Sequence, residues 1–294
     1  MLSCLLAAAM AFTPADAHNA YAVSSNLVSR HTPRDPGTLQ SARAARFLCD
    51  AASAAGLDAR IDRFRADAPG GERWFSNVEA EYRGDPAASW VVLVSHFDTK
   101  PGACCPGAND GAATSGLLVA LAECAARLRP RGANILFVWT DGEECIDSYS
   151  ANDGLWGSRR AAARLNESGR RVAAVVCIDM TGDRDLNISI PRNVSRALAG
   201  RAVSLARAIG LGDAVSRSDV LVKDDHLPFL EAGFEAIDLI DFDYGSAPGL
   251  NDFWHTPEDT MDKVSEKSLL ASGRLVAALI DALASPAAGK WKGK

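Results

Sequence analysis

Hydrophobic and polar residues follow two periods along the chain, and these predict the order of its secondary-structure elements. Apolar and polar residues alternate over residues 59–64 and 75–82, which is typical of a half-buried antiparallel pair of strands. Continuous apolar runs are typical of strands that are buried on both faces of a sheet. These runs predict four central strands, over residues 90–94, 135–139, 172–178 and 236–240.

Apolar residues at helical spacing fill most of the intervals between these strands. Such spacing predicts helices whose apolar face packs on a sheet. The helices are expected over residues 39–57, 117–128, 195–209 and 265–283. Because strands and helices alternate through nearly the whole length, we predict an α/β fold with three layers, αβα, around a mixed, mostly parallel central sheet. No linker-like stretch divides the chain, so we expect a single domain over residues 18–284.

Composition narrows the choice of partners. The 294 residues are 48% hydrophobic and 23% charged, which is ordinary for a globular protein. The net charge of −6 and the lack of a basic stripe argue against nucleic acid as a partner. Beyond the N-terminus no apolar run reaches the length of about 20 residues that a helix needs to cross a bilayer. We therefore expect no membrane span, and we expect a monomer.

The two ends of the chain differ from the rest. Residues 2–12 are apolar, and positions 15–17 read Ala-Asp-Ala, a small-x-small pattern typical of a cleavage site. We predict a signal peptide over residues 1–17 and export to the periplasm or out of the cell; the alternative is an apolar helix that packs on the domain. Cys4 would be a lipoprotein acylation site only if the true start lay upstream. Residues 285–294 carry three lysines among small residues and predict a flexible basic tail.

Acidic and histidine residues follow several of the predicted buried strands. Because open α/β sheets bind ligands at the carboxyl ends of their strands, these side chains can face one cleft. Two imidazoles, several carboxylates and a paired glutamate are the groups needed for a zinc site with nitrogen and oxygen ligands plus a general base. In chain order these five motifs are His96-Phe97-Asp98, Gly107-Ala108-Asn109-Asp110-Gly111, Asp141-Gly142-Glu143-Glu144, Ile178-Asp179-Met180 and Trp254-His255-Thr256. A further acidic and histidine motif, Asp224-Asp225-His226, lies between the last two.

The residue types in each motif limit its role, although any one motif alone would also fit an ordinary core or surface position. His96 ends a strand, and Asp98 would orient its imidazole. Glu143 and Glu144 leave a strand end side by side, so one can bind a metal while the other transfers a proton. An aspartate at the end of a buried run, as at Asp179, is costly unless it is paired or bound to a metal.

The order of these motifs resembles metallopeptidase family twenty-eight, the zinc aminopeptidases. The resemblance covers residues 36–283 and implies a zinc-exopeptidase-like fold. Further segments resemble one branch of that family, the animal-type glutaminyl-peptide cyclotransferases and their bacterial relatives. These segments are Phe75-Ser76-Asn77, Gly154-Leu155-Trp156-Gly157-Ser158-Arg159, Asp224-Asp225-His226-Leu227-Pro228-Phe229 and Trp254-His255-Thr256.

The resemblance implies a single zinc-dependent catalytic domain. Asp110, Glu144 and His255 would hold a catalytic zinc ion, Zn²⁺, and leave its fourth position open for substrate. Glu143 would be the general acid and base. Trp254 would form an aromatic wall against the substrate side chain.

The two branches of the family differ in the number of zinc ions that they imply. In the aminopeptidases His96 and Asp179 would hold a second zinc, and Asp110 would bridge both ions. In the cyclotransferases one zinc is kept, and the aspartates that match Asp179 and Asp224 hydrogen-bond to each other as catalytic residues. The chain has every residue that either version needs. We expect one zinc ion, or two if the protein is an aminopeptidase.

Three further positions bear on which branch of the family the chain resembles more closely. Gly111 favours the cyclotransferases, because the peptidases usually carry Asp or Asn after the bridging aspartate. Tyr149 stands where the animal cyclotransferases have a tryptophan that lines the substrate pocket, and Asp238 stands where they have a histidine. These two departures leave the substrate preference open.

The resemblance therefore allows three functions, all of which take peptide or protein N-termini as partners. The favoured one is a zinc-dependent glutaminyl-peptide cyclotransferase, which converts an N-terminal glutamine into pyroglutamate and releases ammonia. The alternative is a di-zinc aminopeptidase that hydrolyses N-terminal residues. The third is a non-catalytic peptide-binding domain of the same fold, in which we would expect Glu143 or a metal ligand to be missing.

Overall fold

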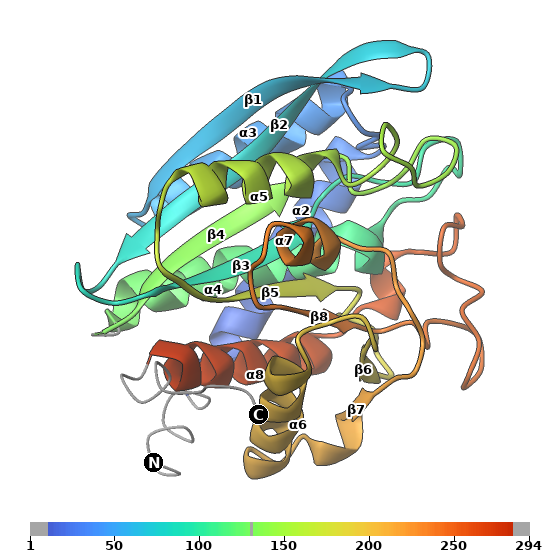
Figure 1. Cartoon of the computed structure of the whole chain (residues 1–294). Helices are drawn as coiled ribbons and strands as arrows, with labels where there is room; N and C mark the ends of the chain where they lie inside the picture. Colours follow the sequence, from blue (N-terminus) through green and yellow to red (C-terminus); the bar gives the residue numbers. More distant parts are fainter. Residues whose placement is uncertain (1–10, 130–131, 285–294) are drawn as a thin grey trace.

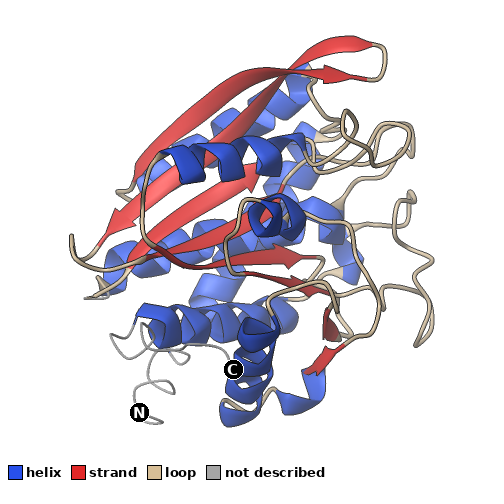
Figure 2. Ribbon diagram, viewed as in Figure 1, coloured by secondary structure: helices blue, strands red, loops and turns tan. Residues whose placement is uncertain are grey.

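The computed structural model describes residues 11–129 and 132–284. Within that part of the chain, eight strands form one mixed sheet with helices on both of its faces (Figures 1 and 2). The strand order is β1-β2-β4-β3-β5-β8-β6-β7, and four of its seven neighbouring pairs are parallel. The predicted three-layer fold is thus confirmed. The strands are β1 Asp58–Ala68, β2 Gly71–Arg83, β3 Trp90–His96, β4 Asn134–Thr140, β5 Val172–Asp179, β6 Ile188–Ile190, β7 Val215–Arg217 and β8 Ala236–Ile240.

The central strands build a separate apolar core on each face of the sheet, because successive side chains along a strand point to opposite faces. On one face Leu93 and Phe137 belong to a large core with helices α2, α3, α4, α6 and α8. On the other face Val92 and Val138 pack with α5 and α7. The helices are α2 Pro14–His31, α3 Leu39–Ala54, α4 Thr114–Leu128, α5 Trp156–Glu167, α6 Arg196–Ala208, α7 His226–Glu231 and α8 Glu266–Ala284, with short helical turns η1 Ala108–Ala113, η2 Gly212–Ala214 and η3 Met261–Lys263.

Every strand and helix predicted from the hydrophobic pattern is present, with its ends shifted by a few residues. The half-buried antiparallel pair is β1 with β2, in which Asp58 pairs with Glu81. The pattern missed α2, α5, α7 and the strands β6 and β7. The two strands have only three residues each, which is too short for any period to be seen.

Helix α2 overlaps the end of the predicted leader, at residues 14–17. Thr13 caps this helix and exchanges hydrogen bonds with Asp16 in a capping box, and the helix packs on α4 and α8. The predicted cleavage position after Ala17 therefore lies inside α2. The signal peptide and export remain predictions, because residues 1–10 with Cys4 lie outside the described residues. The predicted tail at residues 285–294 also lies outside them.

One described segment, Ala108–Leu128, has the length and hydropathy of a membrane-crossing helix. It comprises η1 and α4, and 78% of its most apolar window is buried inside the protein. It therefore packs as a core helix does. The described cysteines are all unpaired. Cys49, Cys124 and Cys177 are buried, as expected for small core residues.

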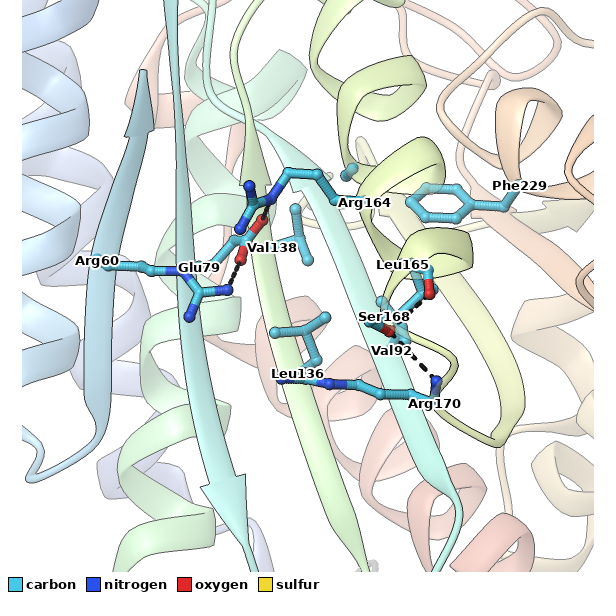
Figure 3. A pocket seen from close by; sticks show the side chains of 11 residues that line it. Arg60, Glu79, Val92, Leu136, Val138, Arg164, Leu165, Ser168, Arg170 and Phe229 are labelled. Atoms are coloured by element: carbon cyan, nitrogen blue, oxygen red, sulfur yellow. Dashed lines mark hydrogen bonds and ion pairs between the residues drawn. The ribbon is translucent and has the colours of Figure 1, made fainter. Parts of the chain in front are cut away.

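A cavity of about 140 Å³ lies between α5 and the sheet (Figure 3). Its floor is apolar and its charged side chains pair with one another: Arg60 lies 2.5 Å from Glu79, and Arg164 lies 3.6 Å from the same carboxylate. None of the residues predicted to form the site lines this cavity. Because the charged side chains of this cavity already pair with one another, we do not assign a catalytic role to it.

The N-terminal segment should contribute measurably to stability. Phe12 is fully buried, and its ring packs directly over Gly273 of α8. We expect Phe12→Ala to lower the free energy of unfolding by about 3–5 kcal/mol, as for other buried aromatic side chains. Denaturant unfolding of the full chain measures this. Leu39→Ala, at a position that is 71% exposed, is the control and should change it by less than about 0.5 kcal/mol. Equal stabilities of the two variants would contradict the packing of Phe12.

Candidate metal centre and active site

The predicted site residues meet at the carboxyl ends of the central strands. His96 is the last residue of β3 and Asp179 is the last residue of β5, its neighbour in the sheet. Glu143 and Glu144 follow β4, on the other side of β3. His255 comes from the loop after β8. The parallel arrangement of these strands thus brings together side chains that lie far apart in sequence.

Asp110, Glu144 and His255 form the first ligand group, with one ligand atom from each within 4.8 Å of the others. Nε2 of His255 lies 2.7 Å from Oε1 of Glu144 and 3.4 Å from Oδ2 of Asp110. Oδ2 of Asp110 and Oε2 of Glu144 are buried without a hydrogen-bond donor in the described part of the chain. Buried carboxylate oxygens need such a partner, and a cation supplies it. One nitrogen and two carboxylates are ligands that zinc accepts, so the group fits a zinc ion.

The pKa shifts of Glu144 and His255 also indicate that this group needs positive charge. Burial and the nearby charge of Asp110 raise the pKa of Glu144 to about 7. Burial opposes protonation of His255, but its contacts with Asp110 and Glu144 raise the pKa of that imidazole to about 9. Without a metal the group therefore holds a proton on His255, and a metal ion must displace it.

His96 and Asp179 form a second group around the same aspartate. Nε2 of His96 lies 3.1 Å from Oδ1 of Asp110 and 3.1 Å from Oδ1 of Asp179. One ligand atom from each of the three residues lies within 4.8 Å of the others. Asp110 thus belongs to both groups, one carboxylate oxygen to each. This geometry accommodates either one zinc ion or two.

Two glycines allow the loop after β3 to present Asp110. Gly107 begins the turn η1 with φ of 63°, and Gly111 follows Asp110 with φ of 93°. These left-handed angles strain any residue with a side chain. A Cβ atom on Gly111 would also lie 2.9 Å from the carbonyl oxygen of Asp98 and 3.0 Å from Cε1 of His96. The backbone must therefore come this close to the histidine to bring Asp110 against it.

Two buried aspartates hold the backbone on either side of the ligands. Asp98 accepts hydrogen bonds from the backbone N–H groups of Glu143 and Glu144, at 3.1 Å each. Asp259 accepts them from Asn109 at 2.7 Å and Asp110 at 3.2 Å. The role predicted for Asp98 was different, since it was expected to orient His96. The Nδ1–Oδ1 distance of 3.6 Å is too long for that hydrogen bond.

Glu143 is held in the state expected of a proton-transfer group. It is buried, and Oε1 accepts a 2.9 Å hydrogen bond from the hydroxyl of Tyr149. Burial raises the pKa of Glu143 well above its ordinary value, and the charges of Glu144 and Asp224 raise it further. A carboxyl group poised in this way can give and take a proton near neutral pH. Tyr149, for which we predicted a place in the wall of the substrate pocket, is the donor of this hydrogen bond.

Trp254 covers one side of the first ligand group. Its indole stacks on the imidazole of His255, with ring centroids 3.8 Å apart and planes 26° apart. The edge of Phe242 packs against the same indole at 5.4 Å. Both Trp254 and His255 are only partly buried. An aromatic surface therefore lies beside the metal ligands at the opening of the site.

The Phe-Ser-Asn and Trp-Gly-Ser segments support the glutamate loop. Asp141, just before that loop, accepts the backbone N–H of Ser76 at 2.8 Å, and its own N–H donates to the amide oxygen of Asn77 at 3.0 Å. Asn77 in turn donates to the carbonyl of Gly157 at 2.8 Å. A side chain on Gly157 would collide with both Asn77 and Asp141. These segments thus act through the backbone of the loop.

Several residues near the site carried no signal in the sequence. Nζ of Lys100 lies 3.8 Å from Oε2 of Glu144 and donates to the carbonyl of Cys145 at 2.6 Å. Arg34 is fully buried and donates to the carbonyls of Phe97 and Gly107, at 2.6 and 2.8 Å. Arg34 comes from the segment between α2 and α3, so only the tertiary fold connects it to the site.

Comparisons with known proteins agree with this geometry. The model of peptidase family M28 matches residues 77–280. The structure of an Acidobacteriales bacterium glutaminyl cyclase superposes with a TM-score of 0.85 at 33% identity, over 91% of this chain and 94% of that one. A glutaminyl-peptide cyclotransferase-like protein of Bos taurus is 27% identical over 281 residues, which cover 85% of this chain and 71% of the relative. An aminopeptidase of Bacillus subtilis (strain 168) is 27% identical over 198 residues, 65% of this chain and 40% of the relative.

The ligand group can be tested by metal content. We expect Asp110→Ala, Glu144→Ala and His255→Ala each to lose zinc, because each removes one of three converging donors. Elemental analysis of the purified variants measures the loss, and a chelator should abolish the activity of the unaltered protein. His18→Ala and Glu258→Ala, at exposed positions, are matched controls that should keep their zinc. Full zinc occupancy in one of the three variants would remove that residue from the ligand set.

Proposed function

Because the chain belongs to peptidase family M28, we propose that it is a zinc-dependent glutaminyl-peptide cyclotransferase, an enzyme that converts N-terminal glutamine of peptides into pyroglutamate. The main support is the similarity to a glutaminyl cyclase over more than nine-tenths of both chains. The zinc ion, held by Asp110, Glu144 and His255, would polarise the carbonyl group that is attacked. One ion is proposed. The protein is proposed to act as a monomer.

Glu143 is proposed to move the proton that the reaction requires. The nitrogen of the substrate's own α-amine attacks the γ-carbonyl carbon of the glutamine side chain, and a new C–N bond forms. Glu143 accepts a proton from that amine and passes it to the amide nitrogen, which leaves as ammonia when the old C–N bond breaks. No water is consumed. Because amine and amide belong to one residue, holding it folded supplies much of the rate through proximity.

Other residues of the cleft are proposed to bind and orient the substrate. Trp254 presents its indole beside His255 and would pack against the small glutaminyl side chain. Tyr149 would line the pocket while its hydroxyl group holds Glu143. Asp179 and Asp224 are proposed as catalytic residues that position the α-amine. Asp179 lies 3.1 Å from His96, and the charge of Asp224 raises the pKa of Glu143.

A di-zinc aminopeptidase remains the second candidate function. The observation that favours it is the second ligand group, in which His96 lies against Oδ1 of Asp110 and Asp179 completes the group. There Glu143 would deprotonate a water molecule that attacks the first peptide bond. A non-catalytic peptide-binding role is less well supported, since Glu143 and all three proposed zinc ligands are retained.

We also propose that the protein is exported to the periplasm or secreted. The basis is the apolar run at residues 2–12 followed by small residues at positions 15 and 17. Sequencing the N-terminus of protein recovered from outside the cytoplasm would test this, and protein found only inside the cytoplasm with residues 1–17 attached would contradict it.

The role of Glu143 can be separated from metal binding. Glu143→Gln keeps the size of the side chain but removes its capacity to carry a proton, so turnover should fall by about 100-fold or more. Zinc content should stay at the level of the unaltered protein. Glu258→Gln, at an exposed position, is the control for the substitution itself. Near-normal turnover in Glu143→Gln would mean that the two adjacent glutamates have been assigned the wrong roles.

The reaction can be identified by weighing its products. Peptides that begin with glutamine or with leucine are offered to the zinc-loaded protein, and the products are analysed by mass spectrometry. We expect the glutamine peptide to lose one ammonia with its chain intact, and the leucine peptide to stay unchanged. Release of free leucine or glutamine, together with two zinc ions per chain, would establish the aminopeptidase instead.

A further inference from the structure

Asp238 is a fully buried carboxyl group within strand β8. Its side chain is 0% exposed, and neither oxygen has a hydrogen-bond partner among the described residues. Asp224, also buried, has an unpartnered oxygen of its own, Oδ2. One oxygen or nitrogen atom from each of Asp224, Asp238 and His226 lies within 4.8 Å of the others. The carboxyl groups of Asp224 and Asp238 therefore lie close together in the interior. When ionised, each can only accept hydrogen bonds, so neither can donate one to the other.

Among the described residues no base donates a hydrogen bond to the unpartnered oxygens of this pair, although the charge of His96 lowers the pKa of Asp224. The nearest base is His226, whose Nδ1 lies 3.6 Å from Oδ2 of Asp238, too far for a hydrogen bond. Burial lowers the pKa of His226 to about 4, so its imidazole is neutral near pH 7. The charges that act on Asp238 come from the carboxylates of Asp224, Asp179 and Asp225. An ionised Asp238 would thus be buried beside like charges with no donor to stabilise it.

A proton on Asp238 removes this conflict. A protonated carboxyl group has an O–H donor, and the acceptor beside it is the carboxylate of Asp224. Burial and the charge of Asp224 raise the pKa of Asp238 well above its ordinary value. Burial also raises the pKa of Asp224, to about 7, and a hydrogen bond donated by a protonated Asp238 would lower it. The proton is therefore held on the deeper residue, and the charge on Asp224.

We propose that Asp238 is a positioning residue, which stays protonated and donates a hydrogen bond that fixes the ionised carboxylate of Asp224 beside the catalytic cleft. This inference rests on the proposed function, in which Asp224 is a catalytic residue. Asp238 itself is too deeply buried to touch substrate. It acts by fixing the orientation of Asp224, whose charge is felt at Glu143.

A pair of variants with nearly equal size separates the hydrogen bond from packing. Asp238→Asn keeps a donor, its amide N–H, whereas Asp238→Leu has none. We expect kcat on a glutamine peptide to fall about 10- to 100-fold in Asp238→Leu and to stay within about 3-fold of the unaltered enzyme in Asp238→Asn. KM should change little in either. An Asn variant as slow as the Leu variant would overturn the proposal, because it would mean that the carboxyl group itself is required; a fully active Leu variant would do the same.

Infrared spectroscopy tests the proton directly and needs no activity. The infrared difference spectrum between the unaltered protein and Asp238→Asn at neutral pH should show that one component of the protonated-carboxyl carbonyl band is lost in the variant. Asp213→Asn, at an exposed position, should keep the band. An unchanged band in Asp238→Asn would refute the protonated state, and loss of a bound metal ion from Asp238→Leu would make the cluster a metal site instead. If the protein cyclises no glutamine peptide, the proposed function fails, while the infrared result still decides the state of Asp238.

Discussion

The concentration of buried carboxyl groups at one edge of the sheet is the constraint on which the site depends. Asp110, Glu143, Glu144, Asp179 and Asp224 are all nearly inaccessible to solvent and lie close enough to shift one another's pKa values. Burying a charge is costly unless a partner offsets it. The partners available here are an imidazole, a hydroxyl or ammonium group, a backbone N–H group, a proton or a bound cation. The partner of each carboxyl group determines its role: it binds the metal, transfers a proton or holds the backbone in place.

Supporting carboxylates are recognised by their contacts with the backbone. Asp98 and Asp259 each accept two consecutive N–H groups, and Asp153 accepts three, from Ile146 to Ser148 in the loop that carries Tyr149. Hydrogen bonds of this kind satisfy the oxygens of a carboxyl group, so no unpaired acceptor is left that requires a metal. Oδ2 of Asp110 and Oε2 of Glu144 lack such donors, and both residues belong to the first ligand group. The loops of the site are thus fixed by carboxylates that are themselves neither ligands nor bases.

The hydrophobic pattern predicted the central sheet well, because its strands are buried on both faces and therefore appear as unbroken apolar runs. Helix α5 was missed because several arginines interrupt its apolar positions, so the hydrophobic face is hard to recognise in the sequence. Its buried residues include Trp156, Ala161, Ala162 and Leu165. Helix α2 was missed because its buried face consists mostly of small and polar residues, such as Ala17, Ala20 and Ser24, which give little apolar signal. Within the site, the motifs and the family resemblance named residues that the fold does bring together. Their roles could be only partly inferred: the partners of Asp98 depend on the path of a loop more than 40 residues away in sequence.

The choice between one zinc ion and two follows from the same balance of charge. Asp110 presents one oxygen to His255 and the other to His96, so the first group does not by itself exclude a second ion. The need for a second ion depends on how much negative charge Asp179, Asp224 and Asp238 carry next to His96. With Asp224 and Asp238 both ionised next to Asp179, a divalent cation there would be strongly favoured. With a proton held between Asp224 and Asp238, His96 and a single proton offset much of that charge. A buried proton can therefore replace a metal ion, and one fold can serve a one-metal or a two-metal chemistry with almost the same side chains.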